Sequence, residues 1–579
     1  MNPEVAASAT AAPLLTRSYA RGATDVPLIE QTIGAFFDDI AAHQPEREAL
    51  VSVHQRRRYS YRQLQREANQ LASALLGLGL QPGERVGIWS HNNAEWLLLQ
   101  LATAKVGLVL VNINPAYRTV EVEYALNKVA CKALVTMASF KTSDYLAMLR
   151  ELAPEWMHGQ PGELQAASLP HLHSVIWIDE AGAGDEQPGM LRFSSLLARG
   201  NADDPRLAAI AATLKATDPI NIQFTSGTTG FPKGATLTHR NILNNGFFIG
   251  EAMKLTSADR LCIPVPLYHC FGMVLGNLAC LTHGAAIVYP NDGFEPLSVL
   301  QAVQDEKCTG LHGVPTMFIA ELDHPRFAEF DLSTLRTGIM AGSPCPTEVM
   351  KRVVEQMNLS QITIAYGMTE TSPVSCQSSV DTPLEKRVST VGLVQPHLEV
   401  KIIDPESSEI VAPGVSGELC TRGYSVMHSY WDDAPRTKEA IDAEGWMHTG
   451  DLATMDSEGY VNIVGRSKDM VIRGGENIYP REIEEFLYRH PKVQDVQVVG
   501  LPDKRYGEEL CAWIVPRPGE TLTEDEVREF CKGKIAHYKV PRYIRFVAGF
   551  PMTVTGKIQK FKIREEMKNQ LGLEEDKTA

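Results

Sequence analysis

Two patterns of hydrophobic and polar residues alternate along the first two thirds of the chain. Apolar residues recur at helical spacing in residues 62–77 and 94–106, whereas residues 85–90 and 107–113 are short runs typical of strands. Helices that alternate with strands predict an α/β fold, with parallel sheets covered by helices. The same alternation predicts further strands at 221–224, 285–289, 336–340 and 361–366 and further helices at 241–253 and 346–357.

The pattern changes from about Gly392. Short strands separated by Pro, Gly, Asp and Ser follow, which favours an antiparallel subdomain. A charged turn comes next, at residues 466–469, and we place a domain boundary there. Beyond the turn lie a helix around Glu482 to Glu485, a strand of sequence VQVVG and a basic segment at residues 532–545.

Composition narrows the class of protein. The chain has 579 residues, and 55 basic against 70 acidic side chains give a formal net charge of −15. Such a balance argues against a nucleic-acid partner, which needs clustered Lys and Arg, but local cations and backbone amides can still bind a small anion. Ten cysteines without a CxxC pair exclude a zinc ribbon and favour reduced thiols, so we expect a cytoplasmic protein.

Neither a membrane span nor a targeting segment is favoured. The most apolar stretch, residues 96–113, is interrupted by Gln100 and Lys105, so it is typical of a buried helix and strand. Residues 1–22 have no sustained apolar core and carry Glu4 beside two arginines, which argues against a leader peptide.

The most informative segment is FTSGTTGFPKG, residues 224–234, which lies between a predicted strand and a helix that begins near Thr238. Glycines let backbone amides approach a ligand, and hydroxyls and a lysine add donors, so the loop suits a polyphosphate. The Walker pattern requires Ser or Thr after the lysine, whereas Gly234 stands there. A plain surface loop is the alternative, and the preceding strand argues against it. The candidate phosphate ligands are Thr225, Ser226, Gly227, Thr228, Thr229, Gly230 and Lys233.

The loop resembles the phosphate-binding signature of the acyl-adenylate-forming (ANL) superfamily, which includes acyl-CoA synthetases, luciferases and peptide-synthetase adenylation domains. The resemblance covers about residues 28–567, and the opening SYARGATDVPLIEQTIG is similar to the acyl-CoA synthetase family member 2 group of medium-chain fatty acyl-CoA synthetases. The family's other motifs occur in order as PLYHCFG (266–272), AGSPCP (341–346), YGMTE (366–370), WMHTGD (446–451), GRSKDMVIRGGENIYP (465–480) and PMTVTGK (551–557).

The resemblance implies an architecture and a reaction. It implies an N-terminal extension (1–27), a large domain (28–466) with two parallel-sheet α/β subdomains and a β-rich one, and a small, mobile α+β C-terminal domain (467–579). It also implies an acid–thiol ligase. A carboxylate attacks the α-phosphorus of ATP to give an acyl adenylate and pyrophosphate, and the thiol of coenzyme A then displaces AMP. Mg²⁺, ATP, coenzyme A and a small-molecule carboxylate are the implied ligands, and a homodimer is left open.

The resemblance implies catalytic roles for four residues. Lys557 would hold carboxylate and phosphate together, because the two anions repel each other. Glu370 would hold Mg²⁺, Thr369 would contact the α-phosphate, and His269 would lie near the carboxylate. The competing interpretations are an ordinary surface lysine for Lys557 and a helix N-cap for Glu370. His269 and Cys270 are adjacent, yet neighbours in a turn point apart, so a thiol nucleophile is not expected.

Nucleotide and coenzyme contacts follow from the same motifs. Tyr366, in the Tyr366-Gly367 pair, would lie against adenine, with Gly342, Ser343 and Pro344 on its other side. Asp451 would accept hydrogen bonds from the ribose hydroxyls, with help from Arg466. Lys468 matches the hinge, and Gly475 would line the pantetheine channel. The groups that bind the coenzyme A phosphates stay open between Arg505 and residues 532–545.

The acyl pocket is the least determined part. Apolar residues follow His269, and residues 244–248 offer apolar and neutral side chains, which favours an alkyl chain over an amino acid. A ligase for aromatic or branched acids, or an adenylating enzyme that loads a carrier protein, is the alternative. A nucleotide-binding protein without catalysis is disfavoured, because Lys557, Glu370 and Asp451 occur together.

Overall fold

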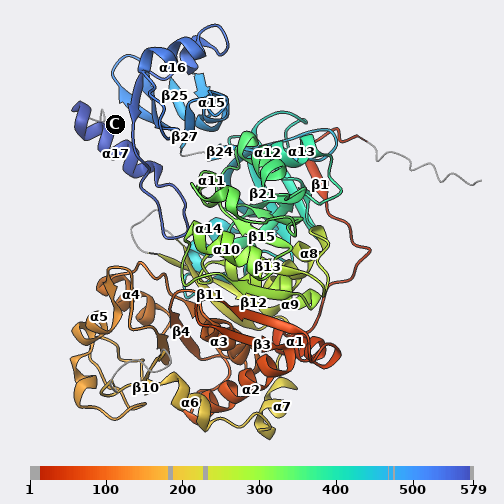
Figure 1. Ribbon diagram of the computed structural model, residues 1–579, viewed down its shortest axis with the longest axis vertical. Helices are drawn as coiled ribbons and strands as arrows, with labels where there is room; N and C mark the ends of the chain where they lie inside the picture. Colours follow the sequence, from red (N-terminus) through yellow and green to blue (C-terminus); the bar gives the residue numbers. More distant parts are fainter. Residues whose placement is uncertain (1–13, 180–186, 226–231, 467–468, 474–475, 574–579) are drawn as a thin grey trace, which may run out of the picture.

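Two large mixed sheets form the body of the N-terminal region in the computed structural model, which describes residues 14–179, 187–225, 232–466, 469–473 and 476–573 (Figure 1). The eight-stranded sheet is parallel from β10 to β11, and β12 and β22 extend it with antiparallel strands. Its strands, in order, are β10 (Leu191–Arg192), β9 (Ser174–Trp177), β6 (Ala133–Thr136), β4 (Arg85–Trp89), β5 (Val109–Asn112), β11 (Pro219–Thr225), β12 (Lys233–Thr238) and β22 (Ser429–Tyr430).

The second sheet has nine strands. It is parallel from β17 to β2, with antiparallel strands at both edges, so the predicted parallel pairing is confirmed in this sheet for β17 to β2. Its strands, in order, are β19 (Leu393–Val394), β18 (Val374–Gln377), β17 (Gln361–Gly367), β16 (Thr337–Met340), β15 (Gly310–Gly313), β13 (Arg260–Cys262), β14 (Ala286–Tyr289), β2 (Glu48–Ser52) and β3 (Arg57–Ser60).

Helices fill the space between these sheets. All twelve residues of α3 (Ala94–Lys105) are buried, which accounts for the apolar stretch noted in the sequence. Helix α8 (His239–Ala252) packs against β12 of one sheet and β18 of the other. Helix α2 (Tyr61–Gly77) begins with a capping box made by Ser60 and Gln63. The predicted helices at 62–77, 94–106, 241–253 and 346–357 are confirmed to within two residues at each end.

Shorter elements complete the two α/β subdomains. The segment after PLYHC forms a π-helix, η2 (Phe271–Leu278), which the sequence pattern did not predict. The other elements are α1 (Ile33–His43), α4 (Thr119–Lys128), β7 (Ser139–Phe140), β8 (Ser143–Asp144), α5 (Tyr145–Leu152), η1 (Pro154–His158), α6 (Phe193–Arg199), α7 (Pro205–Ala211), α9 (Ala279–His283), α10 (Pro296–Asp305), α11 (Pro315–Leu322), η3 (Phe327–Glu329), α12 (Thr347–Gln356), η4 (Thr369–Thr371), α13 (Leu384–Ser389) and α14 (Ala434–Ala440).

The β-rich subdomain is an antiparallel sheet of five strands, as the change of pattern near Gly392 predicts. One edge is β1, which comes from residues 19–21 and pairs with β20, so part of the N-terminal extension adds to this sheet. The strands, in order, are β1 (Tyr19–Arg21), β20 (Leu398–Ile403), β21 (Gly417–Gly423), β23 (Met447–Met455) and β24 (Val461–Arg466).

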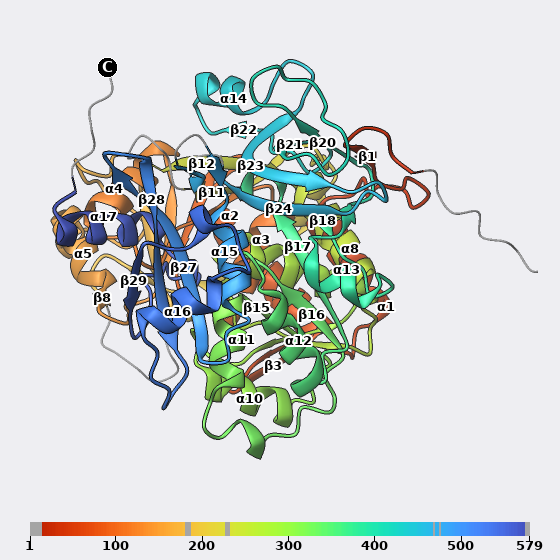
Figure 2. The ribbon, with the colours of Figure 1, turned by 90° about the horizontal axis from the view of Figure 1, so that it is seen from above.

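The C-terminal elements form a separate lobe with its own core, drawn in blue at the top of Figure 1 and seen from above in Figure 2. Strands β26, β25, β28 and β27 form the sheet, and β29 pairs with β28. The bounds are β25 (Val471–Arg473), β26 (Glu476–Ile478), α15 (Pro480–Leu487), β27 (Val493–Asp503), β28 (Gly507–Pro516), α16 (Glu524–Cys531), η6 (His537–Lys539), β29 (Tyr543–Phe546) and α17 (Lys560–Leu571).

Two further expectations concern membrane spans and thiols. Within the described ranges, no helix is both long enough and apolar enough to cross a bilayer. All ten cysteines are buried as free thiols, as expected for a chain without structural disulfides.

Candidate active site

The phosphate-loop segment connects two strands that pair with each other, β11 and β12. Strands β11 and β12 pair antiparallel with Thr225 opposite Lys233, so both residues stand at the same end of the eight-stranded sheet. Strand β12 itself was not predicted, because the sequence analysis extended the loop to Gly234. Five predicted phosphate ligands, Ser226, Gly227, Thr228, Thr229 and Gly230, lie outside the described residues.

A tyrosine that the sequence analysis missed joins Lys233 to Glu370. Tyr430 lies on β22, which pairs with β12, and the Lys233 Nζ sits 4.4 Å from the centre of its ring. The Tyr430 hydroxyl donates a 2.8 Å hydrogen bond to Glu370 Oε1. Burial, followed by the neighbouring Glu370 carboxylate, raises the pKa of Tyr430, so the phenol keeps its proton and acts as a donor. No motif marks this tyrosine in the sequence, since it falls between two family signatures.

Glu370 is a buried carboxylate on η4, directly after β17, and is 5% exposed. The Thr225 hydroxyl donates to the same Oε1 atom at 3.1 Å. Among the described residues, no Lys, Arg or His nitrogen lies within 4.0 Å of this carboxylate, so its described partners are neutral donors. Burial of an uncompensated charge is costly. The site therefore fits a hard divalent cation such as Mg²⁺, which prefers carboxylate, phosphate and water oxygens.

The His269 loop lies next to η4. The Cys270 Sγ is 3.8 Å from the Thr369 hydroxyl, which brings the PLYHCFG and YGMTE motifs together. His269 Nδ1 accepts the Phe271 backbone N–H at 3.1 Å, so this nitrogen carries no proton. Burial, with the positive charge of Lys557, lowers the pKa of His269 to about 4, and the imidazole is neutral near pH 7. The expectation that the two side chains point apart is wrong, because the Cys270 Sγ lies 3.8 Å from His269 Nδ1, but burial raises the pKa of Cys270 to about 12, which argues against a nucleophilic thiol.

Lys557 reaches this site from the C-terminal lobe. It follows a tight turn in which Gly556 adopts φ +77°, a conformation that favours glycine. The turn rests on the N-terminal region, because a Cβ on Gly556 would lie 2.9 Å from Val314 Cγ2 and the Thr316 hydroxyl donates to the Gly556 carbonyl at 3.4 Å. Across the domain boundary the charge of Lys557 lowers the pKa of His269, so the docked turn faces the His269 loop.

Asp451 lies in the middle of β23, opposite Arg466 at the end of β24. Arg466 Nε donates to Asp451 Oδ1 at 3.1 Å, and the Tyr366 hydroxyl donates to Oδ2 at 2.8 Å. All three belong to the predicted nucleotide site, although Tyr366 also holds Asp451 through its hydroxyl, a contact the sequence analysis did not anticipate. Glu418 was missed as well: it accepts the Gly450 N–H at 3.0 Å and pairs with His448 at 3.0 Å, which holds the part of β23 that leads into Asp451.

The predicted adenine contacts meet at the carboxyl ends of neighbouring strands. Gly342, Ser343 and Pro344 follow β16, and Tyr366 and Gly367 end β17, which pairs with β16. Gly367 has no room for a side chain, because a Cβ there would lie 1.7 Å from the Pro373 carbonyl oxygen. Ligands bind at the carboxyl edge in open α/β sheets, so this position suits a nucleotide.

The structure describes only some of the residues that were predicted to bind coenzyme A. Lys468 and Gly475 lie outside the described residues. In the basic segment, Arg542 pairs with Asp503 at 2.9 Å and Arg545 with Glu566 at 2.8 Å, so both cations already have acidic partners. Arg505 stacks on Tyr506, with 5.0 Å between guanidinium and ring centre.

The residues after His269 belong to the core of the N-terminal region. Phe271, Met273, Val274 and Leu275 are each at most 6% exposed and lie in one hydrophobic cluster. Buried amides hold this segment: Gln100 Nε2 donates to the Met273 carbonyl at 3.3 Å, and Asn112 Nδ2 donates to the Tyr268 carbonyl at 2.8 Å. This burial is what plain core residues also show, so the alkyl substrate stays a prediction.

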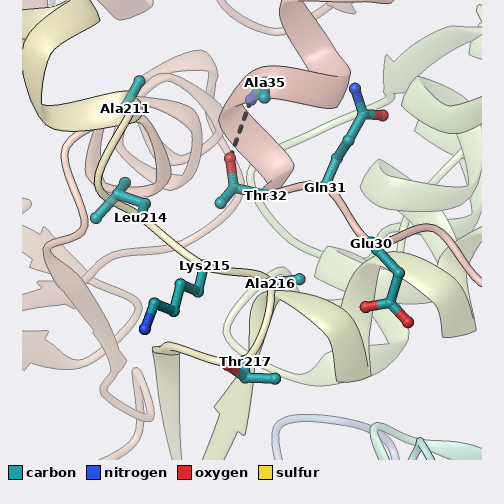
Figure 3. Close-up of a pocket in the computed structure, with 9 residues that line it drawn as sticks. All are labelled: Glu30, Gln31, Thr32, Ala35, Ala211, Leu214, Lys215, Ala216 and Thr217. Carbon is teal, nitrogen blue, oxygen red and sulfur yellow. Dashed lines mark hydrogen bonds between the residues drawn. The ribbon is translucent and has the colours of Figure 1, made fainter.

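A separate open cleft of about 460 Å³ lies away from these residues (Figure 3). It is bordered by residues 30–32 and Ala35 on one side and by residues around 211–217 on the other. The Thr32 hydroxyl is already used there to cap α1, since it accepts the Ala35 N–H at 3.3 Å. No predicted site residue lines this cleft.

Comparison with known proteins identifies the family. A family model described as "AMP-binding enzyme" matches residues 37–431, and one described as "AMP-binding enzyme C-terminal domain" matches residues 482–557. The chain belongs to the AMP-binding enzyme family. The membership agrees with the resemblance to acyl-adenylate-forming enzymes that the sequence motifs carry.

Relatives of this AMP-binding enzyme span nearly its whole length. "Putative acyl-CoA synthetase YngI" from Bacillus subtilis (strain 168) is 50% identical over 541 residues, 93% of this chain and 97% of that one. "Medium-chain acyl-CoA ligase ACSF2, mitochondrial" from Macaca fascicularis is 46% identical over 562 residues, 96% of this chain and 90% of that one. The crystal structure of the anthranilate CoA ligase AuaEII with anthranoyl-AMP has a TM-score of 0.84 at 27% identity, over 95% of this chain and 99% of that one.

Proposed function

We propose that this AMP-binding enzyme is an AMP-forming acid–thiol ligase that converts a medium-chain fatty acid into its coenzyme A thioester through an acyl adenylate. The observation that carries the proposal is the docking of the turn before Lys557 on Thr316, from where the Lys557 charge lowers the pKa of His269, beside the cluster formed by Glu370, Tyr430 and Thr225. A cation and a metal-competent carboxylate are what the first half-reaction requires where two anions must approach each other.

In the first half-reaction, a carboxylate oxygen bonds to the α-phosphorus of ATP while the bond from that phosphorus to the pyrophosphate oxygen breaks. Lys557 would bind both the attacking carboxylate and the α-phosphate and so reduce their repulsion. Thr369 would donate to an α-phosphate oxygen. His269, neutral near pH 7, would border the carboxylate without adding a charge.

The remaining groups would hold the nucleotide. Mg²⁺ bound at Glu370 would supply positive charge to the phosphate oxygens. Lys233, held over the Tyr430 ring, would contact the β- and γ-phosphates together with the loop between β11 and β12. Asp451 is the proposed acceptor for the ribose hydroxyls, and Arg466 and Tyr366 hold its carboxylate in position.

In the second half-reaction, the sulfur of coenzyme A bonds to the acyl carbon and AMP leaves with its phosphate oxygen. Lys557 would have to leave the acyl carbonyl before the thiol arrives, so the proposal includes a rotation of the C-terminal domain between the two half-reactions. We place the domain boundary between residues 466 and 467, with Lys468 as the hinge and Gly475 beside the pantetheine arm.

The medium-chain assignment rests on the relatives. The Macaca protein is named for medium-chain acids and shares 46% identity, whereas the structural neighbour named for anthranilate shares 27%. An aromatic acid is therefore the second candidate. A cytoplasmic location stays a prediction, since the name of the Macaca relative places that protein in mitochondria. A homodimer also stays open, and light scattering on the purified protein would decide it.

The deciding experiment is a pyrophosphate-release assay with linear acids from C2 to C18 and with aromatic and branched acids, in the presence of ATP and Mg²⁺. We expect the highest kcat/KM for medium-chain acids and a coenzyme A thioester as product. A preference for benzoate-type acids would replace the substrate assignment. Transfer to a holo carrier protein in place of coenzyme A would replace the assigned acceptor.

A further inference from the structure

A glutamate of the C-terminal lobe completes a helix of the N-terminal region. Helix α12 begins at Thr347 directly after the AGSPCP loop, and its N-cap residue is Pro346, which has no side-chain acceptor. The first amides of a helix lack partners within the helix. Glu485, on α15, fills this role from the other domain, because its Oε2 accepts the Thr347 N–H at 3.2 Å.

The Glu485 side chain is held at the domain interface. It is 24% exposed, and Arg481 lies one turn earlier on α15 with 3.9 Å between Nε and Oε1. Burial raises the pKa of Glu485, while Arg481 and Thr347 oppose that rise. A carboxylate at a helix N-terminus is stabilised by the unpaired amides and the helix dipole. Breaking this contact returns a carboxylate to water and leaves α12 without its cap.

Two other hydrogen bonds also hold the C-terminal lobe against the N-terminal region. Gln494 Nε2, on β27, donates to Asp323 Oδ2 at 2.8 Å, and Thr316 contacts the Gly556 carbonyl beside Lys557. Both contacts join the C-terminal lobe to the N-terminal region in the same domain arrangement that brings the Lys557 turn onto Thr316. Glu485 differs from them because it binds the helix that carries the adenine loop, residues 341–346.

We propose that Glu485 is a positioning residue that caps α12 from the mobile domain and so favours the orientation for adenylate formation over the orientation for thioester formation. The proposal rests on the proposed two-step function. It assigns Glu485 no contact with substrate. Instead, Glu485 raises the fraction of molecules in which the domain that carries Lys557 is docked beside the adenine loop.

The test measures each half-reaction separately for Glu485→Gln, which keeps the shape and removes the charge. Acyl-AMP formation is followed in single turnovers without coenzyme A, and thioester formation is started from preformed acyl-AMP. We expect adenylation to slow about fivefold, equivalent to ~1 kcal/mol, while thioester formation is unchanged or faster. Equal loss in both steps, or no change in either, would overturn the proposal.

Matched variants distinguish the loss of the α12 cap from a general loss of folding or activity. Glu482→Gln changes a glutamate on the same helix whose partner, Lys539, lies in the same domain at 2.6 Å, so both steps should stay at wild-type rates. Thr347→Pro removes the capped N–H at a helix position where proline is tolerated, and it should reproduce the loss. The double variant should lose no more than either single one, because the two groups act on each other. Additive losses would contradict the pairing.

The wild-type protein distinguishes this proposal from the function it rests on. If the wild type forms no acyl-AMP with any acid, the proposed function fails. If it forms acyl-AMP and thioester normally while Glu485→Gln matches Glu482→Gln, only the positioning role fails. A Glu485→Asp variant, which keeps the charge on a shorter side chain, should recover part of the adenylation rate and shows that the substituted position folds.

Discussion

Replacing Tyr430 by phenylalanine removes one hydroxyl from the cluster around Glu370. The hydroxyl is buried and donates to Glu370 Oε1 at 2.8 Å, while the ring supports the Lys233 ammonium at 4.4 Å. Phenylalanine keeps the ring, so it tests the hydrogen bond alone. The carboxylate would keep the Thr225 hydroxyl as a donor, at 3.1 Å.

The expected magnitude follows from these contacts. A hydrogen bond to a charged group contributes about 1.5–3 kcal/mol, which corresponds to roughly 10- to 150-fold in rate if it acts only in the transition state. We expect a rate decrease at the lower end of this range, because the Thr225 hydroxyl still donates to the same Glu370 oxygen. Tyr430→Leu also removes the cation–π contact, about 0.5–2 kcal/mol, and should cost a further ~2- to 30-fold.

The assay is carboxylate-dependent pyrophosphate release over a range of Mg²⁺ concentrations, with thioester formation from preformed acyl-AMP measured in parallel. Tyr430→Phe should lower the adenylation rate about tenfold, raise the Mg²⁺ concentration required and leave the second step unchanged. Tyr460→Phe is the control, because that tyrosine also has a lysine over its ring, Lys386 at 4.8 Å, and lies outside the proposed site. Adenylation within twofold of wild type at every Mg²⁺ concentration would refute the reasoning.

Three further predictions concern other residues. Lys557→Ala should slow adenylation by about 10²- to 10³-fold and leave thioester formation from preformed acyl-AMP intact, whereas normal adenylation in this variant would remove Lys557 from its role. Asp451→Asn should raise the KM for ATP about tenfold with little change in the KM for the acid, and an equal rise in both would argue against a ribose contact. Glu321, on α11, is 1% exposed, neither of its carboxylate oxygens has a hydrogen-bond partner in the described part of the chain, and burial raises its pKa well above the usual value. An acid whose pKa is raised on folding contributes its full stabilisation below its unfolded pKa and loses it as the pH rises. Glutamine does not titrate, so the unfolding free energy of Glu321→Gln should exceed that of the wild type by an amount that grows between pH 5 and pH 8. The growth is at most ~1.4 kcal/mol per pH unit. Parallel stability curves for the two proteins would contradict a neutral Glu321.

Local patterns in the sequence predict elements well where an element is decided by its own residues. The helix at 62–77 carries its capping box, and α3 is continuous and apolar because it is buried on all sides. Strand β12 was missed because its residues follow a glycine-rich turn and pair only with β11 and β22. The π-helix after His269 was missed too, since its Met273 carbonyl is satisfied by Gln100, far away in the chain.

The sequence by itself determined the family, the order of the motifs and most of the chemical groups, because each motif is a short run whose residue types suit phosphate, ribose or metal. Only the tertiary structure decided which groups meet. Thr225 and Glu370 are 145 positions apart and yet hydrogen-bonded, and Tyr430 joins Lys233 to Glu370 because β22 pairs with β12. The docking of Glu485 on Thr347 depends in the same way on how two domains lie together. Contacts between distant segments arise from strand pairing and domain packing, and no local pattern of hydrophobic and polar residues encodes them.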